Sequence, residues 1–334
     1  MKIKLMFKSI ASVLMLSGSM LSAHAAETQK DNEEGLSSYP EKPITWVIPD
    51  GAGGGLDTIV RTIYPYVQKN MPNDAKFVLQ NLPGATQTIA VAAVYNAEPD
   101  GYTIGQASVA PLTIMPHLGK TSYKSYKDFE LIANVFDAAH YLVVPGDSPY
   151  NTFDEFMENA KENPGSLKVG IDGVYNVQHL PLMDLQQKSG SDLNEIVYKS
   201  SADTKKALLG NEIEAGILPS HIIISEHEEG TLKPLVNIME VKPDYFSEIP
   251  SLKDKGFTPS QLFVGVIAPK GTSKGKLNIL NEAIRKALQD PELVAALTKR
   301  KIMINYNDPD VYGQRLEELD VSNKNILKEL GVLK

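Results

Sequence analysis

Cysteine is absent from the 334 residues of this sequence, and tryptophan occurs once. Without cysteine the chain has no disulfide, no thiol nucleophile and no thiol for a lipid anchor, so its stability has to come from a hydrophobic core. The sequence also lacks a His-Glu-x-x-His metal pair. We therefore predict that the protein is not an enzyme, and we expect no catalytic residue, no cofactor and no metal site.

The N-terminus indicates export. Three lysines among the first eight residues precede an apolar stretch at 10–21, and the small residues of "AHA" follow at 23–25. This order is typical of a secretory signal peptide cleaved after Ala25, and the apolar stretch is too short to form a membrane-spanning helix. We expect a soluble periplasmic protein.

The mature chain is strongly acidic. Loss of the three signal-peptide lysines changes the formal net charge from −8 to −11. Such a surface disfavours nucleic acid and anionic membranes as partners. A small anionic ligand is still compatible with it, because backbone N–H groups bind anions without any cationic side chain.

Alternating strand and helix patterns predict an α/β fold. Candidate strands at 44–49, 76–81 and 102–108 enclose candidate helices at 57–70 and 87–97. This order predicts a mainly parallel sheet flanked by helices. Pro65 is expected to bend or shorten the first helix. The Pro- and Tyr-rich stretch at 110–136 is predicted to be irregular.

A second series of strands and helices follows. Thr152 and Glu155 form a capping-box pattern for a helix at 152–163, and the series continues to a strand near 232–239. A strand at 261–269 then returns to the first series. Further helices are expected at 274–289, 291–299 and 308–331. We predict a two-lobed fold with two hinge crossings, and its segments are a signal peptide (1–25), a flexible leader (26–39), a discontinuous lobe 1 (40–139 and 262–334) and lobe 2 (140–261).

The segment "WVIPDGAGGGLDTIV" at 46–60 carries the main functional signal. Its glycines lie between a strand and a helix, where unpaired N–H groups and the helix dipole favour an anion. A dinucleotide site would need a third glycine where Leu56 stands, and a phosphate loop would need Gly-Lys-Ser/Thr to follow. A tight turn without a ligand remains an alternative, and Asp57 fits an ordinary helix N-cap as well as a ligand contact.

Several motifs in a shared order resemble the Bug family, the periplasmic receptors of tripartite tricarboxylate transporters. They are "YPEKPITWVIPDGAGGGLDTIVR", "NLPGA", "PDGYTIG", "YKSYKDFELIA", "VGIDGVYNVQHL", "VYKSSADTKKALLGNEIEAG" and "VGVIAPKGTSK". The resemblance implies a monomeric clamshell that captures a small organic carboxylate and delivers it to the membrane components of such a transporter. It also implies that backbone amides and small hydroxyls of two facing loops hold the carboxylate.

Carried over by position, the resemblance assigns ligand-binding residues to both lobes. In lobe 1 they are Asp50, Ala52, Gly53, Gly54, Gly55, Leu56, Asp57, Ala85 and Ser108. In lobe 2 they are Asp172, Gly173, Tyr175, Asn176, Gln178 and His179. The chain departs from the family at Asp50, where an aromatic residue is common. It departs also at Leu56, Leu82, Thr86, Gln87 and Leu218-Pro219, so the ligand cannot be copied from a relative.

Two other functional classes remain open. One is a secreted enzyme on the same two-lobed scaffold, and the other is a sensory receptor for the same ligands. The histidines do not favour catalysis or metal binding: His117 and His140 are expected to be structural, and the spacing of His221 and His227 puts them on different helix faces. His179 either shapes the second loop or packs on the sheet.

Overall fold

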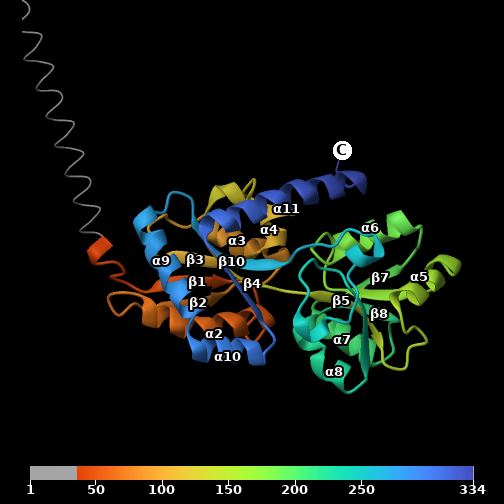
Figure 1. The fold of residues 1–334 in the computed structure, drawn as a ribbon. Coiled ribbons are helices and arrows are strands. Elements are labelled where there is room, and N and C mark those ends of the chain that lie inside the picture. Colours follow the sequence, from red (N-terminus) through yellow and green to blue (C-terminus); the bar gives the residue numbers. More distant parts are fainter. Residues whose placement is uncertain (1–35, 334) are drawn as a thin grey trace, which may run out of the picture.

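The computed structural model describes residues 36–333, and the predicted signal peptide and residues 26–35 of the predicted leader lie outside them. Two separate sheets, each flanked by helices, form the predicted two-lobed α/β fold (Figure 1). The described residues contain no helix long and apolar enough to cross a membrane.

The first sheet has six strands. In spatial order they are β11 (Met303–Asn307), β4 (Phe129–Asp137), β10 (Phe263–Pro269), β3 (Thr103–Ser108), β1 (Ile44–Ile48) and β2 (Phe77–Asn81). One face packs against α2 (Gly55–Asn70), α9 (Lys274–Ala287) and α10 (Pro291–Lys299). The other packs against α3 (Thr88–Tyr95), α4 (Val109–Thr113) and α11 (Pro309–Glu329). Alternation along β1 serves both cores: Trp46 and Ile48 face the first set of helices, and Val47 faces the second.

The second sheet has five strands. In spatial order they are β7 (Asn194–Val197), β6 (Lys168–Ile171), β8 (Ala215–Pro219), β5 (His140–Pro145) and β9 (Leu232–Asn237). Its helices are α5 (Phe153–Glu162), α6 (His179–Ser189), α7 (Ser201–Leu209) and α8 (Ile224–Glu228). Short 3-10 turns lie at Ala85–Gln87, Tyr126–Asp128, Ser220–Ile222, Asp244–Phe246 and Lys253–Lys255. The capping box predicted for α5 is confirmed, because Thr152 and Glu155 bond to each other's backbone N–H.

Three details differ from the sequence prediction. The stretch at 110–136 is not irregular, because it contains α4 and most of β4, and β11 was missed. Strand β4 lies between two neighbours and is buried along most of its length, so it lacks the alternation that marks a half-exposed strand. Pro65 does not shorten α2, because it lies on the exposed side of the helix while Ile63 and Val67 hold the buried side.

The sheets are mixed, although parallel pairs form where they were predicted. Strand β1 pairs in parallel with β2 and β3, and β6 pairs in parallel with β7 and β8. The strands at the crossings run the other way: β10 is antiparallel to β3 and β4, and β5 is antiparallel to β8 and β9. This reversal follows from the chain leaving the first sheet through β4 and re-entering it through β10.

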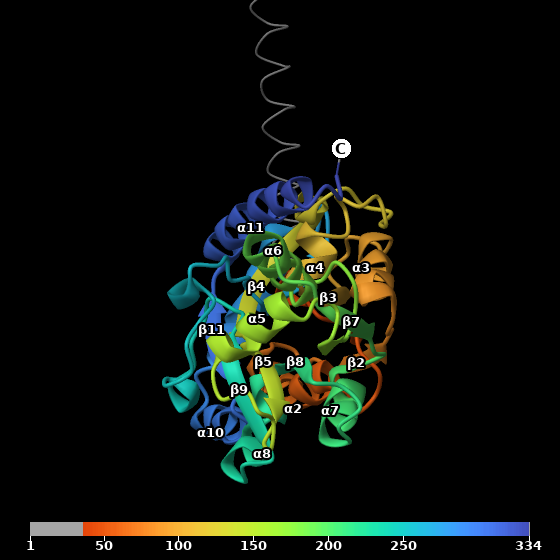
Figure 2. The same cartoon turned by 90° about the vertical axis from the view of Figure 1, so that its right-hand side faces the viewer.

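Two stretches connect the sheets. Residues 138–139 lead from β4 to β5, and residues 238–262 lead from β9 back to β10. The two crossings touch, because the Ala138 N–H donates to the Leu262 carbonyl at 2.9 Å. The predicted lobe boundaries fall within these stretches and remain predictions. Helix α11 adds a third link: it lies over the first sheet and reaches toward α6, where the Gln187 amide donates to the Glu329 carbonyl at 3.2 Å (Figures 1 and 2).

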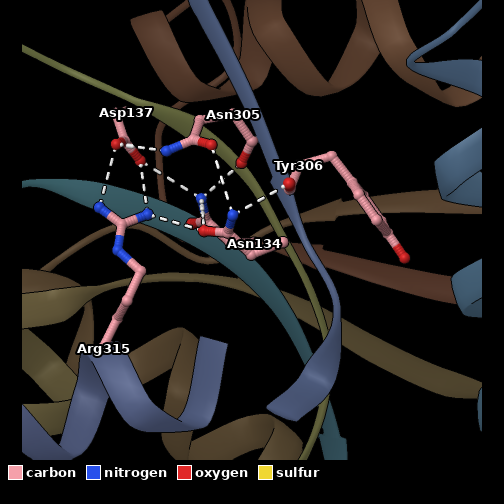
Figure 3. Close-up of polar contacts among 6 residues, drawn as sticks. Asn134, Asp137, Asn305, Tyr306 and Arg315 are labelled. Carbon is pink, nitrogen blue, oxygen red and sulfur yellow. Dashed lines mark hydrogen bonds and ion pairs between the residues drawn. The ribbon is translucent and has the colours of Figure 1, made fainter. Parts of the chain in front are cut away.

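A polar cluster fixes the ends of both crossing strands. The Arg315 guanidinium of α11 binds both carboxylate oxygens of Asp137 at 3.0 Å (Figure 3). It also lies 4.0 Å from the ring centroid of Phe263, the residue paired with Asp137 across the sheet. Asn305 donates to Asp137 at 2.7 Å from β11. One cation thereby holds the last residue of β4 and the first residue of β10.

Replacing Arg315 with alanine should lower the free energy of unfolding by about 3 kcal/mol, because the buried Asp137 carboxylate loses its counter-ion. Urea unfolding measures this loss. The control is Arg285→Ala, which breaks a pair with Glu282 on the surface of α9 and should cost far less, because exposed ion pairs contribute little to stability. Equal losses in the two variants would contradict a special role for the hinge cluster.

Candidate functional site

The predicted residues of lobe 1 lie at one edge of the first sheet. The glycine loop at 50–57 follows β1, the Pro-Gly-Ala turn with Ala85 follows β2, and Ser108 ends β3. These three strands are parallel neighbours, so their carboxyl ends lie side by side. Open α/β sheets bind ligands at this edge.

The predicted residues of lobe 2 lie at the equivalent edge of the second sheet. The loop at 172–178 follows β6, Ser201 follows β7, and the Ser220–Ile222 turn follows β8. Strand register brings this edge to the crossings, because Pro219 at the end of β8 pairs with His140 at the start of β5. In the first sheet Ser108 likewise pairs with Val264 near the start of β10. Both carboxyl edges therefore lie beside the hinge.

Contacts between the two edges are already present. The Nε2 atom of His221 lies 3.8 Å from the position that a Cβ atom on Gly55 would take. The Lys120 ammonium lies 5.9 Å from the ring centroid of Tyr175. Within residues 36–333, however, the first loop makes no direct hydrogen bond to the loop at 172–178.

Asp50 organises the glycine loop from within. Its carboxylate accepts hydrogen bonds from the N–H groups of Gly51 at 2.8 Å and Leu56 at 3.0 Å. A Cβ atom on Gly54 would lie 2.2 Å from the nearer carboxylate oxygen, so only glycine leaves room for this side chain. The anion that the loop was predicted to hold is thus, in part, the protein's own carboxylate.

Asp57 is the second internal anion of the loop. It is 1% exposed and accepts hydrogen bonds at 2.8 Å from the Gly53 N–H, the Asn81 amide and Arg61. The hydrogen bond from Arg61 is the largest of the causes that lower the pKa of Asp57 to about 2. Asp57 therefore stays ionised and neutralised by Arg61, and it anchors the loop to the end of β2.

The N–H groups left for a ligand on the first loop are few. Gly54 donates to the Gly51 carbonyl at 3.0 Å, so its N–H is also used. The exposed Ala52 and Gly55 keep N–H groups that bond to no acceptor among the described residues. The side chain of Leu56 packs against the core between α2 and the sheet. The first loop therefore leaves fewer N–H groups free than its number of glycines suggested.

A left-handed turn forms the neighbouring wall. Ala85, Thr86 and Gln87 have consecutive φ values of 47°, 52° and 69°, a conformation that costs each non-glycine residue about 1 kcal/mol. Gln87 accepts a hydrogen bond from the Ser108 N–H at 3.2 Å, and the Thr88 hydroxyl donates to the Ala85 carbonyl at 2.8 Å. The turn thereby fixes the backbone at the end of β3.

The second loop is held by its own side chains. Asp172 accepts hydrogen bonds from Asn176 and Gln178 at 3.2 Å and from the Ser201 hydroxyl. Asn176 accepts from the N–H groups of Gln178 at 3.0 Å and His179 at 2.9 Å, and so caps α6. Gly173 and Tyr175 have φ values of 153° and 54°, which turn the backbone between these contacts.

His179 shapes the second loop, one of the two roles that the sequence left open. Its Nδ1 atom bonds to the Tyr175 N–H at 2.8 Å, and its Nε2 atom lies 2.8 Å from Glu195. Gln186 donates to the other oxygen of Glu195 at 2.7 Å. His179 also helps to line an open depression of about 560 Å³ beside Leu330, which no residue of the first loop reaches.

His140 and His221 were not assigned to the site from the sequence. Burial lowers the pKa of His140 to about 3, with a smaller effect from His221. Burial, followed by Lys205, also lowers the pKa of His221. Both imidazoles are therefore neutral at neutral pH. The available signal was position alone: His221 directly follows β8, on the ligand-binding edge. Residues 36–333 contain no cluster of metal-ligating side chains.

The buried His140 should make the protein sensitive to acid. Below pH 6.5 the unfolded chain protonates this imidazole, whereas the folded protein does so only near pH 3, so stability falls across that range. Between pH 7.5 and 5.5, His140→Gln should lose about 1.4 kcal/mol less stability than the wild type, measured by urea unfolding.

The control for this measurement is Asn323→Ser, which changes a buried polar side chain that does not titrate and that bonds to Thr113 at 3.0 Å. This variant should lose as much stability as the wild type on acidification. An acid-induced loss in His140→Gln equal to that of the wild type would show that the imidazole is free to charge in the folded state.

Comparison with known proteins identifies the family. Residues 59–332 match the model of the tripartite tricarboxylate transporter family receptor, TctC. The UPF0065 protein of the gbd 5′ region in Cupriavidus necator is 30% identical over 315 residues, which cover 94% of this chain and 93% of that protein. A TctC solute-binding protein from Polaromonas, solved without ligand, superposes with a TM-score of 0.73 at 28% identity, covering 87% of this chain and 99% of that one.

Other solved structures share the fold. The periplasmic binding protein BugD has a TM-score of 0.77 at 25% identity and covers 89% of this chain and all of its own. Malate-bound MatC of Rhodopseudomonas palustris has a TM-score of 0.76 at 21% identity and covers 86% of this chain and 100% of its own. An adipate-bound protein of R. palustris has a TM-score of 0.76 at 20% identity and covers 88% of this chain and 98% of its own. The chain belongs to the tripartite tricarboxylate transporter receptor family, whose members are solute-binding receptors and not enzymes.

Proposed function

We propose that this protein captures a small organic carboxylate in the periplasm, between lobe 1 (40–139 and 262–334) and lobe 2 (140–261). It acts as a monomer and delivers the ligand to the membrane components of a tripartite tricarboxylate transporter. Family membership supports the receptor role. The malate and adipate bound by two proteins of the same fold support the ligand class.

One observation carries this proposal: the loops that follow β1 and β6 lie on carboxyl edges that meet beside the hinge. On the first edge the donors for a carboxylate are the N–H groups of Ala52 and Gly55 and the Ser108 hydroxyl. On the second edge they are N–H groups of the loop at 172–178. Asp57, Asn176 and His179 contribute by shaping these loops, since their polar atoms bond to the protein.

Closure of the lobes completes the site. The ligand binds first to the loop of one lobe, and the other loop then closes over it. Closure requires higher affinity for the closed form than for the open form, and donors from two lobes supply that difference. The two crossings bond to each other between Ala138 and Leu262, and the Arg315 cluster fixes the strand ends beside them, so we place the rotation at residues 138–139 and 262.

A sensory receptor for the same ligand class is the remaining alternative. It would share every feature of the binding site and differ only in its membrane partner. Reconstitution with transporter membrane subunits separates the two roles, because only the transport receptor would stimulate uptake of its ligand.

Binding should be visible as thermal stabilisation of the mature chain in a screen of small organic acids, because a ligand specific for the folded state raises the melting temperature. Gly54→Val should abolish the shift, since its Cβ would displace Asp50 from the loop. Gly51→Ala is the matched control: a Cβ there meets no atom within 4 Å, and the shift should persist. Stabilisation by nucleotides or metals alone, or a full carboxylate shift in Gly54→Val, would contradict the proposal.

A further inference from the structure

We infer that Asp50 sets the ligand class by requiring a hydrogen-bond donor, above all an ammonium group, at the ligand end that lies beside its carboxylate, while the carboxylate at the other end takes the free N–H groups of the site. A ligand with a second carboxylate beside Asp50 is disfavoured. This inference rests on the proposed function, because it specifies which carboxylates the site accepts. The preferred ligand is then a carboxylate with an amino group at its other end.

Protein carboxylates already occupy most of the N–H donors at the amino end of α2. A ligand carboxylate on the first loop would compete for N–H groups at the amino end of α2. Asp50 already takes two of them, Gly51 and Leu56, and Asp57 takes Gly53. The side chain of Asp50 lies over Gly54, within 2.5 Å of where a Cβ would stand. An incoming carboxylate would therefore have to displace Asp50 or lie next to it.

Asp57 and Asp50 differ in how their negative charges are balanced. Asp57 is neutralised by Arg61 at 2.8 Å and is shielded from solvent. Asp50 is half-buried and has no ion-pair partner in the described part of the chain. Its charge is balanced only by backbone dipoles, so a further anion beside it is repelled, whereas a cation is attracted.

On the opposite wall, the side chain that faces the first loop carries no charge. His221 faces Gly55 and is neutral at neutral pH because burial lowers its pKa. Lys205, the charged group that acts on His221, is paired with Glu226 and bonds to the Ile222 carbonyl at 2.9 Å. An ammonium group of the ligand has the donors and the charge to complement Asp50, which His221 does not supply.

Two matched ligand pairs test this inference by calorimetric titration of the mature protein. Succinate is compared with 4-aminobutanoate, and adipate with 6-aminohexanoate, so each pair differs mainly at one end group. The wild type should bind the amino acid of at least one pair ten-fold or more tighter than its dicarboxylate partner. In Asp50→Asn, which keeps the side-chain shape, that ratio should fall at least ten-fold.

The control variant is Asp308→Asn. Asp308 also accepts a backbone N–H at a helix start, from Val311 at 2.9 Å, but it lies at α11. Its loss should leave the affinity ratio unchanged. A purely structural role of Asp50 would lower stability in Asp50→Asn without changing the ratio, and that result would overturn the inference.

The outcomes separate this inference from the proposed function. Wild-type preference for the dicarboxylates would overturn the inference and leave the carboxylate receptor intact, and this result needs no variant to fold. Binding of none of the four probes, together with no stabilisation by any organic acid, would contradict both.

Discussion

The first loop depends on two carboxylates that bond to the backbone at the amino end of α2. Asp50 and Asp57 together accept the N–H groups of Gly51, Gly53 and Leu56, and Asp57 also joins the loop to Asn81 at the end of β2. The glycines matter because they let these side chains approach the backbone. At Gly54, for example, a Cβ atom would overlap the Asp50 carboxylate. The loop is therefore preorganised by internal anions, and only the N–H groups that they leave free are offered to a ligand.

The way in which β10 and β5 join their sheets places both loops beside the crossings. Antiparallel entry of β10 and β5 into their sheets brings the carboxyl ends of the ligand-bearing strands beside the crossings. Arg315 fixes Asp137 and Phe263, the two residues next to those crossings, while the end of α11 contacts α6. The Arg315 anchor and the two crossings, which bond to each other between Ala138 and Leu262, define a hinge whose closure acts directly on the loops.

The sequence predicted the order of most elements and the position of both loops, because strand periodicity, glycine and capping residues are local signals. It missed β4, since a strand buried between two neighbours shows no alternation, and it missed β11, a half-buried edge strand whose residues likewise do not alternate between buried and exposed. It also could not show that Asp50 points into its own loop, nor that His221 approaches Gly55, because both facts depend on side-chain direction and on packing between residues far apart in the chain. The absence of cysteine excluded thiol chemistry and disulfides but could not choose the ligand.

The most direct test is a crystal structure of the mature protein with the organic acid that stabilises it most. If Asp50 organises the loop and selects the ligand, its carboxylate still accepts the N–H groups of Gly51 and Leu56. A nitrogen or hydroxyl donor of the ligand then lies about 3 Å from that carboxylate. A ligand carboxylate seated on those two N–H groups, with the Asp50 side chain turned away, would contradict this role of Asp50.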